Sequence, residues 1–336
     1  MDTLELMTAI TVLLASMNLG VTFVWPAAVK HRVKKEYKYV LQAISKYDGY
    51  LINQERFLDN ATLCKVEVEN RSDLKILFPY IEKIANYVGE DELKLLYTNL
   101  KSATLEKCKL KHGTIGVWRP TEKKILYKVD KSLGHELLHV ASSFYDEVRK
   151  ELQCGFSQAS EEGLAEIGNG LNEGYTEYLT FQIFGEDKNS GYKNLTLIAR
   201  LLELFFDDPK EMEKFYFGHD LPGFIHYMER FIPYDRMISI ILSLDKIDIY
   251  EHGYEKGVTL EMVNVEMELY RYFIESNASP EKLEKFENII KQKEVTAKAL
   301  KREKKRMVKE SLQNDDDYLD DLEYFDDDLN YGGIAK

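Results

Sequence analysis

Apolar residues recur along most of this chain at the three- and four-residue spacing that gives a helix one buried face. The pattern is helical from residue 66 to 109, with Pro79 and Gly89 as interruptions, and again from residue 180 to 275. The chain has only 7 Pro among its 336 residues, so few positions force a helix to end. The pattern therefore predicts a mainly α-helical protein. In the second region, the expected helix breaks lie at Gly185, Pro209, Pro222-Gly223 and Pro233.

Two short runs depart from the helical pattern because they are rich in β-branched and aromatic residues. They cover residues 113–119 and 124–129, and Pro120-Thr121-Glu122-Lys123 lies between them. Strand-forming runs on either side of a short turn sequence predict a β-hairpin. Residues 155–170 show neither periodicity and predict a loop. The expected fold class is therefore α+β, mainly α with a small β-hairpin or sheet.

The beginning of the chain has a third kind of pattern. Residues 6–29 contain no charge, and as a helix they would be about 36 Å long, enough to cross a hydrocarbon core of about 30 Å. Five basic residues follow between Lys30 and Lys38, and such a flank stays on the cytoplasmic side. We therefore expect a single-pass membrane anchor over residues 1–29 and a helical stalk over residues 30–60. The rest of the chain is expected in the cytoplasm.

Charge changes the picture at the other end of the chain. Residues 281–313 are expected to form a basic helical segment, since nine basic and two acidic residues lie between residues 291 and 309. Residues 314–336 form an acidic tail; removing its nine acidic residues would change the formal net charge from −13 to −4. Such a tail is typically disordered, and its interspersed aromatic residues suggest a protein partner. We expect no nucleic-acid partner, because no recognition motif accompanies the basic segment.

The three cysteines carry little functional information. Cys64, Cys108 and Cys154 are widely spaced and belong to no paired motif, which is typical of a reducing compartment. Each is expected to be a small apolar filler.

The strongest chemical signal is His135-Glu136-Leu137-Leu138-His139. Residues four apart lie on one face of a helix, so the two imidazoles can reach one Zn²⁺ at about 2.0–2.1 Å. The glutamate would then lie beside the metal and could take a proton from bound water. Asp130 and Ser132 offer N-cap chemistry just before the motif, so a helix is expected to begin there.

A second segment supplies the carboxylates that such a site needs. A catalytic zinc takes a third protein ligand and keeps one position open. Glu173 and Glu177 lie on one face of an expected helix whose apolar residues include Leu171 and Tyr175. One carboxylate could bind the metal, and the other could orient a ligand imidazole by accepting its free ring N–H.

Together these two segments resemble the gluzincin metallopeptidases, in which His-Glu-x-x-His precedes a helix containing Asn-Glu-x-x-x-Asp/Glu. Asn172 to Glu177 carry the second part of the resemblance, which covers roughly residues 110–185. It implies a zincin-like metallopeptidase domain over residues 61–280, which binds one Zn²⁺ per chain. His135, His139 and Glu173 match the ligands, Glu136 the general base, and Glu177 the carboxylate that holds the first histidine. Gluzincins also use a downstream His or Tyr to stabilise the oxyanion; the candidates are Tyr175, Tyr192, His219 and His226.

The function expected from this resemblance is hydrolysis of peptide bonds through Glu-assisted attack of zinc-bound water. The partner would be a peptide or protein substrate, and no signature for a substrate amine is present, which favours an endopeptidase. The hairpin could pair with an extended substrate or could simply cover the core.

Two other functions fit the same sequence. The chain could be a catalytically inactive zinc-binding scaffold or sensor that acts through its charged C-terminal tail. It could also be a membrane-tethered interaction protein without metal.

Overall fold

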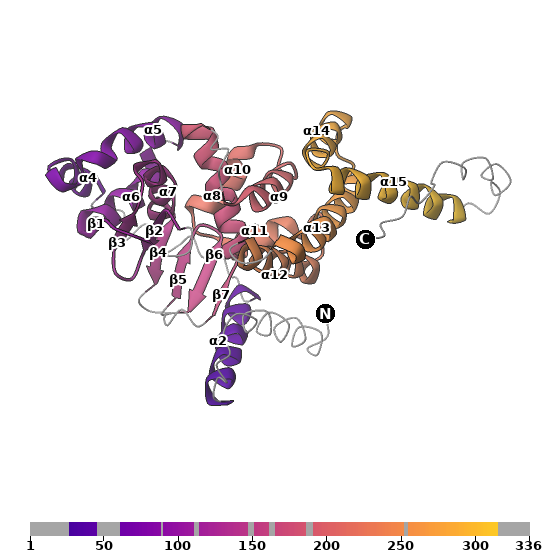
Figure 1. Ribbon diagram of the computed structural model, residues 1–336, viewed down its shortest axis with the longest axis horizontal. Helices are drawn as coiled ribbons and strands as arrows, with labels where there is room; N and C mark the ends of the chain where they lie inside the picture. Colours follow the sequence, from indigo (N-terminus) through magenta and orange to yellow (C-terminus); the bar gives the residue numbers. More distant parts are fainter. Residues whose placement is uncertain are drawn as a thin grey trace, which may run out of the picture.

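The structure is a computed structural model. It describes residues 27–45, 61–88, 90–110, 114–146, 151–160, 165–185, 191–251 and 255–314. These residues form a mainly helical protein with two small sheets, so the predicted α+β class is confirmed (Figure 1). The expected membrane anchor, apart from residues 27–29, and the acidic tail beyond residue 314 lie outside the described residues. None of the described helices is long and apolar enough to cross a membrane.

The helical pattern between residues 66 and 109 forms three α-helices and a 3₁₀-helix, and then a strand that the pattern did not predict. Pro79 lies in the first turn of its helix, where the missing N–H costs nothing, and the next helix begins just after Gly89. The strand, β1, lies where helix was expected because it pairs in parallel with a strand twenty residues later. The elements are α4 (Ala61–Glu69), η2 (Ser72–Leu77), α5 (Phe78–Val88), α6 (Glu90–Ser102) and β1 (Thr104–Lys107).

The predicted hairpin is present and belongs to a three-stranded sheet. Strands β2 (Gly116–Arg119) and β3 (Lys124–Tyr127) are antiparallel, and the sheet order is β1-β3-β2. Ile125 and Trp118, which face each other across the hairpin, are buried. Strand β2 therefore lies at an edge of this sheet, a position that matters for the site.

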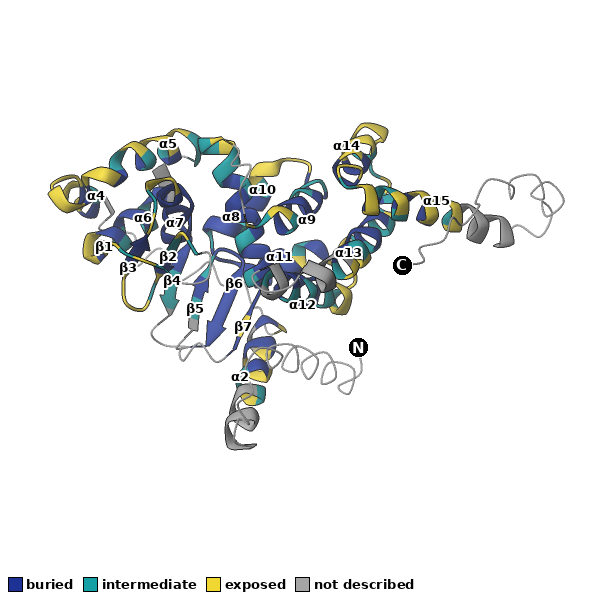
Figure 2. Cartoon of the chain, in the orientation of Figure 1, coloured by how far each residue is buried: buried dark blue, intermediate teal, exposed yellow. Residues whose placement is uncertain are grey.

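A second sheet, with four antiparallel strands in the order β4-β5-β6-β7, connects the two motif helices along the chain. Two of its strands lie in residues 155–170, so the expected loop there is wrong. The reason is that β6 is buried throughout although three of its four residues are polar (Figure 2). Both α2 and α8 contact β6, and a strand covered on both faces shows no apolar–polar alternation. The strands are β4 (Ser143–Asp146), β5 (Glu151–Cys154), β6 (Ser157–Ser160) and β7 (Glu166–Ile167).

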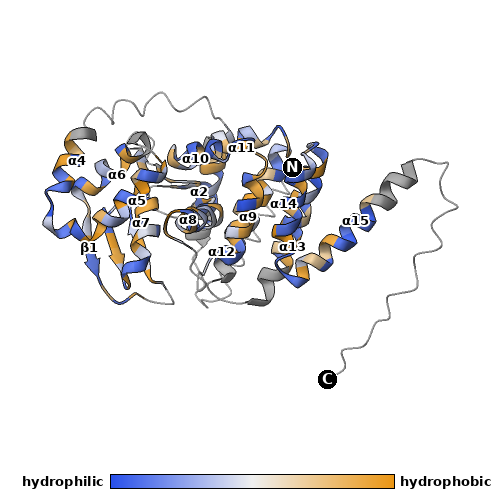
Figure 3. Cartoon of the chain, turned by 90° about the horizontal axis from the view of Figure 1, so that it is seen from above, coloured by the Kyte–Doolittle hydropathy of each residue, from blue (hydrophilic) through white to orange (hydrophobic). Residues whose placement is uncertain are grey.

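The remaining helices begin and end close to the expected breaks. Gly185, with φ of 96°, follows the last residue of α8, and Pro209 begins α10. Helix α15 projects from the body at the end of the described chain (Figure 3). The helices are α7 (Leu133–Ala141), α8 (Asn169–Phe184), α9 (Lys193–Glu203), α10 (Pro209–Phe217), α11 (Leu221–Met228), α12 (Tyr234–Glu251), α13 (Glu255–Glu275), α14 (Pro280–Ile290) and α15 (Glu294–Asn314).

The first described helix, α2 (Ala27–Ser45), contains residues 30–45 of the expected stalk; residues 46–60 lie outside the described part of the chain. Its residues Tyr37, Val40, Leu41 and Ile44 are buried in the hydrophobic core. The helix contacts β6, β7 and α11, and in Figure 1 it lies beneath β7. This part of the chain is therefore packed against the second sheet.

Candidate metal centre

Helix α7, which carries the His-Glu-x-x-His motif, lies in the middle of the core. All nine of its residues are buried. It begins at Leu133 after a 3₁₀ turn, η3 (Asp130–Ser132), as the sequence predicted, but the expected side-chain cap is absent. The Ser132 hydroxyl instead donates to the carbonyl oxygens of Val129 and Ile115, at 2.8 and 3.1 Å. Ser132 thus ties the start of α7 to the segment that precedes β2.

Helix α8, which carries the two carboxylates, begins at a backbone conformation that favours glycine. Gly168 has φ of 88°, in the left-handed region that residues with a Cβ rarely adopt. The N–H groups of Gly168 and Gly170 both donate to the carboxylate of Asp245 on α12, at 2.9 and 2.8 Å. A residue distant in sequence therefore caps the helix that carries Glu173. Nothing local in the sequence pointed to Asp245.

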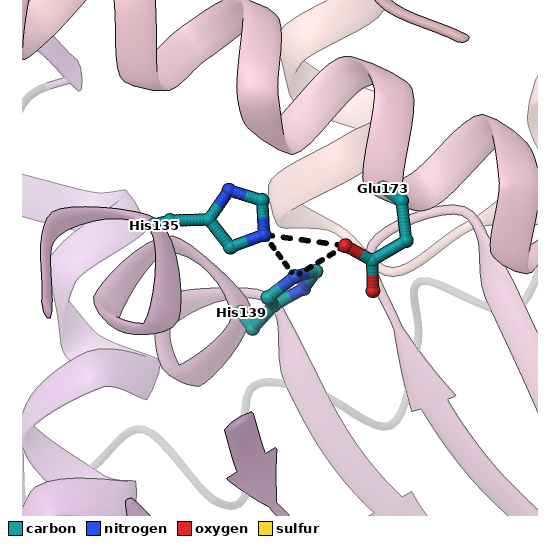
Figure 4. Close-up of side chains that lie close together, drawn as sticks. All are labelled: His135, His139 and Glu173. Atoms are coloured by element: carbon teal, nitrogen blue, oxygen red, sulfur yellow. Dashed lines mark hydrogen bonds and ion pairs between the residues drawn. The ribbon is translucent and has the colours of Figure 1, made fainter. Parts of the chain in front are cut away.

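The two helices bring the three predicted ligands together (Figure 4). The Nε2 atoms of His135 and His139 are 3.0 Å apart, and a Glu173 Oε2 atom lies 3.2 Å from the first and 3.5 Å from the second. Ligand atoms bound to a tetrahedral zinc at about 2.0–2.1 Å would lie roughly 3.3–3.4 Å from one another. The three observed separations bracket this value. His135, His139 and Glu173 can therefore hold a metal ion.

A further set of side chains holds the ligands in place. Glu177 Oε2 lies 2.9 Å from Nδ1 of His135, on the side of the ring away from the ligand atoms. This is the orienting contact expected for Glu177. The Nδ1 atom of His139 instead lies 3.3 Å from Asn172 Nδ2 and 3.6 Å from Cys154 Sγ. The role of Asn172 was missed although it directly precedes Glu173, and no signal marked Cys154.

The pKa values of the ligand side chains are shifted, because imidazoles and carboxylates lie close together in a buried site. Burial by itself would lower the pKa of His135, but hydrogen bonds with Glu173 and Glu177 outweigh it and raise that pKa to about 9. The pKa of His139 is also raised, because Glu173 overcomes the effect of burial. The pKa of Glu173 is lowered well below its usual range, because the two histidines overcome its desolvation. Metal ligation requires an unprotonated ring nitrogen, so a bound cation would act against these raised pKa values.

Glu136 lies next to the ligands on α7 but points towards strand β2. It is buried, with 5% of its surface exposed, and burial raises the pKa of its carboxyl. The backbone of Trp118 forms a hydrogen bond that acts in the opposite direction. A Cβ atom added to Gly116 would lie 2.5 Å from Glu136 Oε1, so the glycine lets the strand pass close to this carboxylate.

The four candidates for oxyanion stabilisation have different surroundings. His226 is largely exposed and pairs with Glu229 at 2.7 Å. His219 is buried against the ring of Phe144, with centroids 4.9 Å apart, and burial lowers its pKa to about 3. Tyr175 is buried, and its hydroxyl donates to Glu203 on α9. None of these three lines the cavity at the ligands.

Tyr192 is the candidate that the structure brings to the ligands. Its ring stacks on His135, with centroids 5.8 Å apart and an interplanar angle of 8°. Burial and the neighbouring Glu173 both raise the pKa of its phenol, so the hydroxyl remains a donor at neutral pH. The stacking depends on a turn just before α9, and no motif marks it in the sequence.

The ligands open into a cavity of about 420 Å³. One wall is β2 and the residues before it, and another is α8 together with Tyr192. The second sheet contributes Cys154, Ser157 and Glu166. This volume lies in the range of ligand-binding clefts, about 300–1,000 Å³. His135, Glu136, His139, Glu173 and Glu177 all line it.

Comparison of the chain with protein-family models, curated proteins and solved structures finds no match. The assignment of a function therefore depends on the residues and geometry of this cavity.

Proposed function

We propose that the protein is a zinc-dependent metallopeptidase with a gluzincin-type site. The observation that carries the proposal is the convergence of His135, His139 and Glu173 on one point of a cavity that Glu136 also lines. Two imidazoles and one carboxylate are the ligand set typical of zinc in hydrolytic enzymes. A zinc ion bound there would polarise a substrate carbonyl and lower the pKa of a coordinated water towards about 7.

The protein's own groups then supply the proton transfers. Glu136 takes the proton of the attacking water and passes it to the amine that leaves. Burial raises the pKa of Glu136, which suits a carboxylate that must both accept and release a proton near neutral pH. The Tyr192 hydroxyl, held by stacking on His135, donates a hydrogen bond to the oxygen on which negative charge develops.

Strand β2 provides the surface for the substrate in this proposal. Its outer edge is unpaired among the described strands, and it lines the cavity. An extended peptide could add to that edge through backbone hydrogen bonds, which place few demands on sequence. A cavity entered along a strand edge suits an internal peptide segment, so we assign endopeptidase activity.

The membrane location is proposed from the sequence, because residues 1–26 lie outside the described part of the chain. An anchor there would hold the enzyme at the membrane, with its catalytic domain in the cytoplasm. Protease protection of sealed vesicles tests the orientation: the catalytic domain should be digested only from the cytoplasmic side.

The central experiment measures metal and activity on the full chain in detergent. We expect about one zinc per chain, cleavage of an unfolded protein substrate, loss of cleavage with a chelator and recovery on addition of zinc. A zinc-loaded chain that cleaves neither unfolded proteins nor a mixed peptide library would contradict the proposal and favour the scaffold alternative.

A further inference from the structure

A carboxylate that the proposed mechanism does not use also lies in the cavity. Glu166, on the short strand β7, lines the cavity together with the metal ligands. Its side chain is solvent-exposed, yet desolvation by the surrounding protein raises the pKa of its carboxyl. A group that is both accessible and closely surrounded faces a concavity, so the exposed part of Glu166 opens into the cavity.

Glu166 is held by a hydrogen bond and forms no ion pair with another described residue. Its Oε1 accepts a hydrogen bond of 2.6 Å from the Ser157 hydroxyl on the neighbouring strand β6. No ion pair of Glu166 occurs within the described ranges of the chain, although 19 such pairs are found elsewhere in them. Its carboxylate interacts electrostatically with His139 and Glu173, so it lies near the metal centre without belonging to it.

The backbone around Glu166 is well supported. Strand β7 pairs with β6 and contacts both α2 and α12. Tyr37 of α2 is buried next to the Glu166 backbone, and α2 lies beneath β7 in Figure 1. A cavity-lining carboxylate that forms no ion pair within the described residues can still form a charge-assisted hydrogen bond with a cationic group.

We propose that Glu166 is a specificity-determining residue that binds a positively charged group of the substrate beside the scissile bond. This inference rests on the proposed peptidase function and names its substrate class: peptides with an ammonium or guanidinium group near the cleavage point. Two sources supply that chemistry: a Lys or Arg side chain, which agrees with the proposed endopeptidase activity, and a free α-amino group, which would replace it by aminopeptidase activity.

The test compares matched fluorogenic peptides on the zinc-loaded full chain. One arm uses N-acetylated peptides that carry either one Lys or a norleucine at the same position. The other arm compares free and acetylated N-termini in peptides without basic residues. We expect kcat/KM to favour the cationic member by about 10-fold or more in at least one arm. The arm that shows the preference identifies its source.

Three variants test whether Glu166 causes the preference. Glu166→Gln keeps the size and the hydrogen bond from Ser157, so we expect normal zinc content and a preference ratio that falls to about one. Glu166→Lys should reverse the preference towards a peptide with Glu at the tested position. Glu281→Gln removes an exposed carboxylate paired with Lys285 on α14 and should leave the ratio unchanged. An unchanged ratio in a zinc-loaded Glu166→Gln chain would overturn the inference.

Peptide binding separates this inference from the proposed function. Fluorescence anisotropy with Glu136→Gln measures the same preference without turnover, and adding Glu166→Gln should remove it. If the wild-type chain cleaves nothing while this binding preference disappears on substitution, the peptidase proposal fails and the cation site stands. If cleavage occurs and the binding preference is the same with and without Glu166→Gln, the peptidase proposal stands and the cation site fails.

Discussion

Helices α7 and α8 each carry part of the candidate metal site, but they are held in different ways. In α7, the two histidines and the glutamate lie within five consecutive residues, and the whole helix is buried. In α8, the position of Glu173 depends on a helix start that is capped from α12 by Asp245. Figure 1 shows α8 between the second sheet and the later helices.

In one half of the site, neighbouring residues of the chain fix the positions of the ligands. In the other half, distant segments fix the position of the ligand. The spacing of His135 and His139 follows from helix geometry wherever α7 lies. The distance from either histidine to Glu173 depends on the packing of α8 against α9, α12 and β6. Substitutions in α7 should therefore affect chemistry or ligation directly, whereas some substitutions far from α8 should affect the site through its position.

The largest effect is expected from α7. Glu136→Gln should lower kcat by a factor of about 10²–10⁴ or more, because the proton acceptor is lost, while zinc content stays near one per chain. His135→Ala should remove both zinc and activity. Zinc analysis and peptide hydrolysis on the same preparations check this, and cleavage that survives Glu136→Gln would show that another group is the base.

The next effect separates the two carboxylates of α8. Glu173→Gln should remove zinc almost fully, because a carboxylate ligand is lost. Glu177→Gln should lower zinc affinity or activity by about 10–100-fold, because it only orients His135. Competition with a zinc chelator measures both affinities. Equal losses would contradict the separate roles assigned from their contacts with His135.

A smaller effect, on stability, is expected from replacing Asp245 of α12, which accepts hydrogen bonds from the start of α8. Asp245→Asn replaces one of the two accepting oxygens by an NH₂ donor, so one buried N–H group loses its acceptor and the free energy of unfolding should fall by about 1–3 kcal/mol. Zinc affinity should fall less than in Glu177→Gln. Asp248→Asn is the matched control, because an amide oxygen can still accept the hydrogen bond from Asn169. Urea unfolding measures the change, and equal loss in both variants would argue against a capping role for Asp245.

The smallest effect is expected in how the stability of the folded chain depends on pH, and bound zinc should act in the opposite direction. Burial raises the pKa of Asp245 to about 7 and that of Glu266 to about 8. Between pH 5 and 8 the folded state therefore binds more protons than the unfolded state, and stability falls as pH rises. The raised pKa of His135, about 9, acts in the same direction, because its stabilising contribution is full below about pH 6.5 and is lost towards pH 9.

Zinc binding should have a pH dependence opposite to that of the metal-free chain, because zinc binds only neutral imidazoles. The stabilisation of the full chain by zinc should therefore grow from pH 6 to pH 8, whereas the metal-free chain becomes less stable. Urea unfolding at both pH values, with zinc and with chelator, measures this. A zinc-induced stabilisation that is equal at the two pH values would contradict metal binding through His135 and His139.

Several features could be predicted from sequence because neighbours along the chain decide them. Pro209 marks a helix start because its φ is fixed, and Gly185 marks a helix end because glycine can adopt a positive φ; the hairpin follows from a turn between strand-forming runs. The errors lie where distant segments decide the outcome. Strand β6 is buried between α2 and α8, so its polar residues gave no pattern, and Ser132 donates to Ile115 rather than capping α7.

The sequence by itself determined which groups are available for metal chemistry, namely a His-Glu-x-x-His motif and two carboxylates on one helical face. Local spacing was enough for this, because the period of an α-helix is the same in every fold. Only the tertiary structure decided that Glu173 reaches the histidines, that Tyr192 rather than His219 or His226 lies beside them, and that Glu166 faces their cavity. Those relations join segments tens of residues apart, and packing and remote hydrogen bonds set the distances between them.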